Sequence, residues 1–267
     1  MLGNTKDAID TYEDGLKRYP AAGNLYLERG VMEIKKEDYS KAVQFFEKGI
    51  EQAPMFSSNY YWAARLFCLG SAQKYWGMIY GELFMNLESG SKRTADISKI
   101  LYDTYKSQIQ FPTDTSISVH FAGPMTININ YNPKDGANAL AELLNQANNM
   151  KQMYGTRVYE PVLSLALAGE KRIDLASLNR VRTRFLDVYE QQGHQTRQPV
   201  VLFDRQREIR TAGHLEAYNY WLLSEGDKVA FNHWQLANDA KWQAFVDWFR
   251  EHAISITDDN KFNMEKY

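Results

Sequence analysis

Residues 23–56 read GNLYLERGVMEIKKEDYSKAVQFFEKGIEQAPMF, and this stretch decides the fold class. Gly30 and Ala42 are small, as two antiparallel helices require at a close crossing, because a larger side chain would push the helices apart. Aromatic residues fill the spaces beside that crossing. The stretch therefore predicts a helical hairpin with helices over 24–36 and 39–52, joined by a short polar turn.

The pattern of this hairpin recurs along the chain at a shift of 34 residues. The shift places residues of the same class on one another at five positions: Ala8 on Ala42, Tyr12 on Phe46, Gly15 on Gly49, Leu16 on Ile50 and Pro20 on Pro54. The prolines fall where each unit ends, since proline cannot continue a helix. A fixed period of this length is typical of stacked helical repeats.

The residues at these positions resemble the tetratricopeptide repeat, and Tyr26 and Tyr39 complete the motif. Two unrelated amphipathic helices are the alternative, but they would have to match the family's period by coincidence. Arg29 stands where the family usually has Leu, and Glu33 where it usually has an aromatic residue, which indicates a divergent repeat. The resemblance implies an α–α superhelix with a partial first repeat, one full repeat over 23–56 and a degenerate repeat over 57–88.

Beyond these repeats the sequence predicts a mainly α-helical chain with an irregular helical bundle. A capping helix near 94–109 should close the repeat region. Apolar residues alternate with polar ones on both sides of a Gly-Pro turn near 117–131, which predicts an inserted β-hairpin. The predicted division is 1–110 for the repeats, 111–134 for the hairpin insertion, 135–257 for the helical domain and 258–267 for a flexible polar tail.

The C-terminal helical domain is predicted from amphipathic stretches between short loops that carry Gly or Pro. The expected helices are 136–154, 161–168, 175–191, 200–210, 214–223 and 239–252. The stretch 213–221 resembles the tail of uncharacterised bacterial tetratricopeptide proteins, and that resemblance implies no activity.

Composition excludes some classes of function. The formal net charge of −2 gives no reason to expect a nucleic-acid partner. The single cysteine, Cys68, excludes an internal disulfide and is expected to be a buried, inert thiol. No apolar run reaches the roughly 18 residues of a transmembrane helix. By the repeat register the chain starts inside a unit, so a signal sequence could precede it, and bacterial cytoplasm and periplasm both stay open.

Chemical motifs of enzymes are missing from the sequence, so no catalytic residue, metal ligand or cofactor is predicted. His214 and Glu216 are two positions apart on an expected helix and point to different sides, so they do not suit one metal ion. The many Arg residues over 171–210 could form an anion-binding face, but pairing with nearby acidic residues in the same domain is favoured.

The remaining candidate is the concave groove of the repeats, which in tetratricopeptide proteins is lined mainly by the first helix of each unit. By register this groove is lined by Asn24, Leu27, Val31, Ile34 and Lys35 in one unit, and by Ser58, Tyr61, Arg65, Cys68 and Leu69 in the next. Leu27 and Val31 replace the Lys and Asn with which some family members hold a peptide carboxylate, so that clamp is absent. Tyr61 and Arg65 are the expected anchors.

The sequence therefore predicts a non-enzymatic scaffold that binds a protein or peptide partner, or a second copy of itself, through this groove. In one alternative the groove is closed, with its side chains buried against the C-terminal domain. In the other, the protein is an enzyme or an anion-binding protein whose site lies between the repeats and that domain. Converging His, Glu and Arg side chains in a cleft would favour the enzyme.

Overall fold

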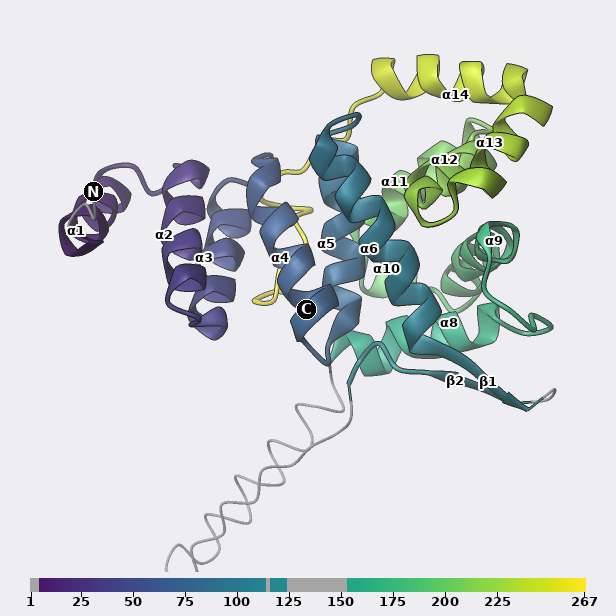
Figure 1. Cartoon of the computed structure of the whole chain (residues 1–267), viewed down its shortest axis with the longest axis horizontal. Coiled ribbons are helices and arrows are strands. Elements are labelled where there is room, and N and C mark those ends of the chain that lie inside the picture. The colour runs from purple at the N-terminus through teal and green to yellow at the C-terminus, as the bar shows by residue number, and fades with distance from the viewer. Residues whose placement is uncertain (1–4, 114–115, 124–152) are drawn as a thin grey trace, which may run out of the picture.

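The computed structural model describes residues 5–113, 116–123 and 153–267, and Figure 1 shows the arrangement of their helices. The chain is mainly α-helical, with one two-stranded antiparallel β-hairpin in the described part. The predicted fold class is confirmed at this level.

The N-terminal part forms a row of consecutive helices (Figure 1). They are α1 (Thr5–Arg18), α2 (Gly23–Lys35), α3 (Tyr39–Gln52), α4 (Ser57–Gly70), α5 (Lys74–Leu87) and α6 (Lys92–Gln108). The crossing of α2 and α3 requires Gly30, because a Cβ atom there would lie 2.3 Å from the Phe46 ring. Asp38 caps α3 by accepting from the Lys41 N–H. The helices predicted from small residues, aromatics and prolines are therefore present.

The β-hairpin differs from the prediction in its pairing. Strand β1 (Ile109–Thr113) precedes β2 (Ser116–Val119), and Ile109 pairs with Val119. The predicted strand after Val119 was expected to be the partner, but it lies outside the described residues. Pro112 sits where the register is irregular, between the Gln110 and Thr113 pairs, a place where a strand tolerates proline. Strand β1 was not predicted, because the hairpin was expected only near 117–131.

The C-terminal part of the chain consists of further helices of unequal length (Figure 1). They are the π-helix η1 (Gly155–Tyr159), α8 (Glu160–Ala166), α9 (Leu175–Gln191), α10 (His194–Arg197), α11 (Val201–Thr211), α12 (Leu215–Leu222), the 3-10 turn η2 (Ser224–Gly226), α13 (Lys228–Ala237) and α14 (Asp239–Glu251). The predicted helices of this domain are present, except that most of 136–154 lies outside the described residues. Helix α13 was not predicted.

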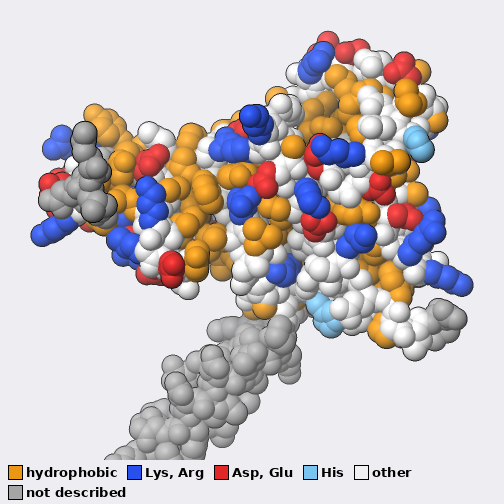
Figure 2. All heavy atoms as spheres, in the orientation of Figure 1, with side chains coloured by type: hydrophobic (Ala, Val, Ile, Leu, Met, Phe, Trp, Pro, Cys, Tyr) orange, Lys and Arg blue, Asp and Glu red, His pale blue; other side chains and the backbone are white. Residues whose placement is uncertain are grey.

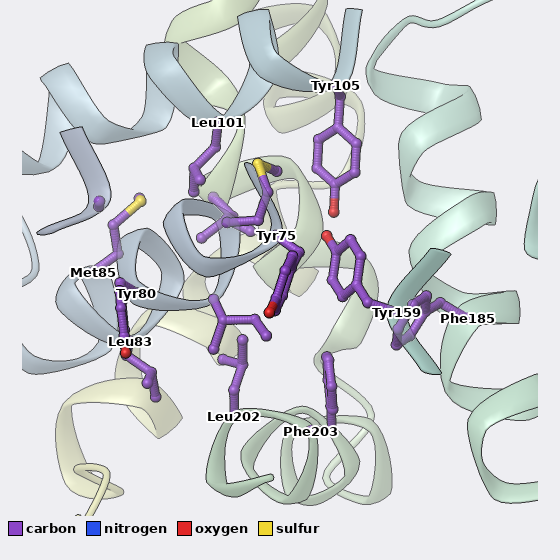
Figure 3. Packing of buried hydrophobic residues seen from close by; sticks show 14 of the residues in the cluster. Tyr75, Tyr80, Leu83, Met85, Leu101, Tyr105, Tyr159, Phe185, Leu202 and Phe203 are labelled. Carbon is purple, nitrogen blue, oxygen red and sulfur yellow. The ribbon is translucent and has the colours of Figure 1, made fainter. Parts of the chain in front are cut away.

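One hydrophobic core extends from α3 to the last residues of the chain. Helix α5 lies at its centre and has 12 of its 14 residues buried. Figure 3 shows Tyr75 of α5 beside Tyr159 of η1, with Phe185 and Phe203 of the C-terminal helices close by. The two regions therefore stabilise each other by sharing apolar surface.

The last residues, 253–267, return from α14 to the repeats, and we call this segment the C-terminal strap. The prediction of a flexible tail over 258–267 is wrong. Phe262 is fully buried and its ring packs on Trp76 and Tyr80 of α5. Lys261 Nζ also donates to the Glu51 carbonyl oxygen at 2.7 Å. The polar composition suggested a solvated end, but one aromatic side chain anchors the segment.

None of the helices in the described part of the chain is both long and apolar enough to cross a bilayer.

Candidate functional site

The predicted groove residues of α2 lie on a surface that is only partly open. Asn24 and Lys35 are exposed, whereas Leu27 and Val31 are half-buried and pack against the core. These four side chains line neither of the hollows described below, whereas Ile34, the fifth predicted groove residue of α2, lines the larger of them.

The predicted groove residues of α4 are held by α6. The Tyr61 hydroxyl donates to Asp96 Oδ2 at 2.9 Å, and Arg65 forms an ion pair with the same carboxylate. Arg93 Nη1 donates to Ser58 Oγ at 2.9 Å and covers the Ser58 side chain. The expected anchors Tyr61 and Arg65 therefore already have partners within the chain. Helix α6 packs against the face of α4 that was predicted to be open.

A hollow of about 900 Å³ lies between α3 and α4, next to the end of α2, and we call it the α3–α4 hollow. Residues 263–265 of the strap form one of its walls. Apolar side chains dominate the lining, among them Val43, Trp62 and Leu66. Figure 2 shows hydrophobic side chains exposed over the region of α2 to α4.

Three lining residues of the hollow are large apolar side chains that are exposed to solvent. The exposed fractions are 53% for Tyr39, 62% for Leu69 and 42% for Met264. Single exposed apolar residues are common on soluble proteins, but several around one hollow are typical of an interaction site. Of the ten groove residues predicted from sequence, Ile34, Arg65 and Leu69 line this hollow.

The acidic side chains of the hollow are not all balanced by cations. Lys48 pairs with Glu51 at 2.7 Å. Glu47 is half-buried as a residue, but its carboxylate is enclosed: Oε2 accepts from the Met264 N–H at 3.0 Å, and the Tyr80 hydroxyl of α5 lies beside the carboxylate in the core. Burial raises the pKa of Glu47 to about 7. The hollow therefore combines an apolar lining with an acidic residue whose carboxylate is buried beneath it.

A second cluster of polar groups lies between α5 and the C-terminal helices. Glu82 of α5 accepts two hydrogen bonds from Arg182 of α9, at 2.5 and 2.9 Å. Its Oε1 also accepts from Gln206 Nε2 at 2.6 Å and from the Tyr218 hydroxyl at 2.8 Å. Arg182 Nε donates to Asn219 at 2.7 Å. Buried polar groups that satisfy one another in this way hold elements in a fixed arrangement.

The cavity beside this cluster is small. Its volume is about 20 Å³, which is room for roughly one water molecule. Three nitrogen atoms of the Arg182 guanidinium already donate to protein groups, so little of it is left for a bound anion. No histidine lines the cavity. The cluster is therefore suited to join the two regions rather than to hold a substrate.

The basic stretch over 171–210 is largely paired within the chain. Arg180 and Arg184 both contact the Glu170 carboxylate. Arg207 and Arg210 share the Glu190 carboxylate in the same way. This arrangement follows the expected pairing of charges within one domain, and it leaves less free positive charge for an external anion.

The remaining candidates for chemistry are engaged in packing. The His214 ring lies 5.4 Å from the Trp248 ring, while Glu216 accepts from Trp234 Nε1 at 3.1 Å and from Lys241 Nζ at 2.8 Å. Within the described ranges no group of three His, Cys, Asp or Glu residues could hold a metal ion. Cys68 is buried, and burial raises the pKa of its thiol to about 12.

Comparison with protein-family models, with curated proteins and with solved structures gave no match. The class of this protein therefore rests on its structure alone. It is a mainly α-helical protein built on consecutive helical hairpins, with an apolar hollow beside them.

Neither the packing of the strap nor its contact with α3 was predicted from the sequence. The packing of this segment could have been predicted in part. Ile254, Ile256 and Phe262 are apolar residues between polar ones, and all three are buried. The strap contacts Met55 and the helices α3 and α5, which are about 200 residues earlier in the chain. Sequence periodicity carries no information at that separation.

Proposed function

We propose that this protein is a non-enzymatic scaffold of the tetratricopeptide type that binds a segment of a partner protein in the α3–α4 hollow. The observation that carries the proposal is the hollow of about 900 Å³ with Tyr39, Leu69 and Met264 exposed around it. Its volume is in the range of pockets that enclose a ligand. An apolar lining with exposed apolar side chains favours a partner that buries its own apolar residues.

The proposed binding surface differs from the groove predicted from sequence. Tyr61 and Ser58 are engaged by α6, so the free apolar surface is on the side where α3 and α4 meet the strap. A short helix or an extended segment with two or three apolar anchors would suit a hollow of this kind.

The test uses a displayed library of random peptides that is selected on the full chain. The affinity of enriched peptides is then measured by fluorescence anisotropy for the wild type, Leu69→Asp and Leu236→Asp. Both leucines are exposed, at 62% and 80%, but only Leu69 lines the hollow. We expect Leu69→Asp to weaken binding by about tenfold or more, because a buried charge in an apolar contact is unfavourable.

Leu236→Asp is the matched control and should leave the affinity unchanged. Equal affinities for all three proteins would contradict binding in the hollow. A second copy of the chain is another possible occupant, and it would show as a dimer whose dissociation constant changes with Leu69→Asp in analytical ultracentrifugation.

The second candidate function is an enzyme or an anion-binding protein with a site between the repeats and the C-terminal domain. The Glu82–Arg182 cluster is the constellation that would serve it. The cavity of about 20 Å³ and the internal pairing of Arg182 argue for the scaffold instead.

A further inference from the structure

The walls of the α3–α4 hollow are formed mainly by faces of two helices. Successive turns of α3 contribute lining residues from Ser40 to Glu51, a length of about 17 Å along that helix. On α4 the lining residues are again three or four positions apart along one face, namely Trp62, Arg65, Leu66 and Leu69. The Trp62 ring stacks on the ring of Phe46 of α3, with centroids 6.3 Å apart. The hollow therefore follows two helices that are in direct contact.

We infer that the partner segment binds in this hollow as an amphipathic α-helix of about three turns, with an uncharged apolar stripe toward α3 and α4. The inference rests on the proposed function, because it names the conformation and the chemistry of the segment bound at the same place.

The main-chain groups of the lining favour a helix over an extended segment. The lining residues belong to α2, α3, α4, the turn after α4 and residues 263–265 of the strap, and neither strand of the described structure is among them. In the strap the Met264 N–H already donates to Glu47 Oε2. An extended segment would bury many of its own N–H and C=O groups against apolar side chains, and each unpaired group costs free energy. A helix satisfies these groups internally, and an amphipathic helix in a groove is a recurring mode of peptide recognition.

The charged groups of the lining are paired within the chain or enclosed in the core. Lys48 pairs with Glu51 at 2.7 Å and also interacts with Glu265. Arg65 forms an ion pair with α6, and the Glu47 carboxylate is enclosed. A charged side chain that entered the hollow would lose its hydration without meeting an unpaired counter-charge. The stripe that contacts the hollow is therefore uncharged.

The apolar groups of the hollow match the stripe of such a helix. Val43, Trp62 and Leu66 lie along the walls, and Leu69 and Met264 are exposed at its edge. A helix of three turns presents three or four apolar side chains on one face. Contact between that face and the lining removes apolar surface from water on both partners, which favours binding.

The experiment uses displayed random peptides of about 16 residues, long enough for four helical turns. They are selected on the full chain, and those whose affinity falls with Leu69→Asp are kept. An alanine scan of such a peptide, measured by fluorescence anisotropy, should place its main anchors three or four positions apart. Anchors two positions apart, as in an extended segment, would contradict the helix.

Proline substitutions in the peptide give a second measurement of its bound conformation. Proline at a central position that is not an anchor should weaken binding about a hundredfold, because it breaks a helix. Proline at the first residue is the matched control and should leave the affinity unchanged, since a helix tolerates proline there. Two central α-aminoisobutyric acid residues, which favour helical backbone angles, should tighten binding about threefold, because a short free peptide is only partly helical.

Charge substitutions in the peptide test the uncharged stripe. Lys or Glu at one anchor should each weaken binding about tenfold or more, whereas the same residues at a position between anchors should change it less than about twofold. Tighter binding with either charge at an anchor would show that the stripe is not restricted to uncharged residues.

Three outcomes separate the two proposals. Binding that depends on Leu69 but has anchors two positions apart and is insensitive to central proline overturns the helix and leaves the scaffold standing. Peptides that bind regardless of Leu69→Asp, or a selection without any binder, overturn both. A dimer of the chain that excludes the peptides and is lost in Leu69→Asp overturns the partner helix, because a second copy then occupies the hollow.

Discussion

The carboxylate of Glu47 lies where three elements meet. Helix α3 carries it, Tyr80 of α5 lies close by, and Met264 of the strap donates its N–H to Oε2 at 3.0 Å. Removing a carboxylate from water disfavours its charged form unless a cation replaces the lost hydration. A single buried side chain thus makes the stability of the packing between α3, α5 and the strap dependent on pH.

Glu47→Gln should become increasingly stabilising, relative to the wild type, as the pH rises. The folded protein holds the proton of Glu47 up to about pH 7, whereas the unfolded chain releases it near its ordinary value of 4.5. The wild type therefore loses stability between these two values, and Gln does not titrate. We expect the difference in unfolding free energy to grow by about 2–3 kcal/mol from pH 5 to pH 8.

Urea unfolding of both proteins at the two pH values measures this difference. Glu28→Gln is the control, since its side chain is exposed, and its effect should be the same at both pH values. A constant difference for Glu47→Gln would show that the buried carboxylate does not titrate in this range.

At the level of elements, α6 and the strap cover parts of helices α3 to α5 and leave the remaining faces exposed. Helix α6 covers the face of α4 that carries Ser58 and Tyr61. The strap crosses α3 and α5 and ends as a wall of the hollow. Both elements thereby leave the space between α3 and α4 exposed.

Phe262→Ala should destabilise the protein by about 3–5 kcal/mol, because a fully buried aromatic side chain leaves a cavity that the core fills only in part. Thermal and urea unfolding, followed by circular dichroism, measure the loss. Hydrogen exchange of α3 and α5 should also become faster in this variant. Asp259→Ala in the same strap is exposed and should change stability by no more than about 0.5 kcal/mol. Equal effects of the two substitutions would mean that the strap is not anchored by Phe262.

The whole molecule is held together by a shared core and by the ion pair between Glu82 of α5 and Arg182 of α9. Both side chains are almost completely buried, with exposed fractions of 5% and 7%. Such a pair adds little net stability compared with apolar residues, but loss of one member leaves the other as an unbalanced buried charge. The pair therefore couples the repeats to the C-terminal domain.

Arg182→Ala should lower the free energy of unfolding by about 3–5 kcal/mol, because Glu82 then loses its cation in the core. Arg180→Ala is the matched control on the same helix. Arg180 pairs with Glu170 but has 57% of its side chain exposed, so its loss should cost at most about 1 kcal/mol. Urea unfolding of both variants tests the contrast, and similar losses would refute the coupling role of the buried pair.

The positions of helices were largely predictable from local signals. Helix α3 begins after Asp38 and ends before Pro54, and Gly30 marks its crossing with α2. Helix α13 was missed, although Asp227 caps it, because only Trp234 is buried on that helix and its apolar pattern is weak. The candidate site was predictable only in part, since Ile34, Arg65 and Leu69 line the hollow and the other expected groove residues do not.

The sequence by itself determined the helical class, the hairpin units and most helix ends, because these depend on side chains within a few residues of one another. Only the tertiary structure decided which surface is open. The engagement of Tyr61 by Asp96, the burial of Phe262 against α5 and the enclosure of Glu47 under Met264 join residues 35 to more than 200 positions apart. Such contacts depend on how whole elements pack, and local periodicity does not encode them.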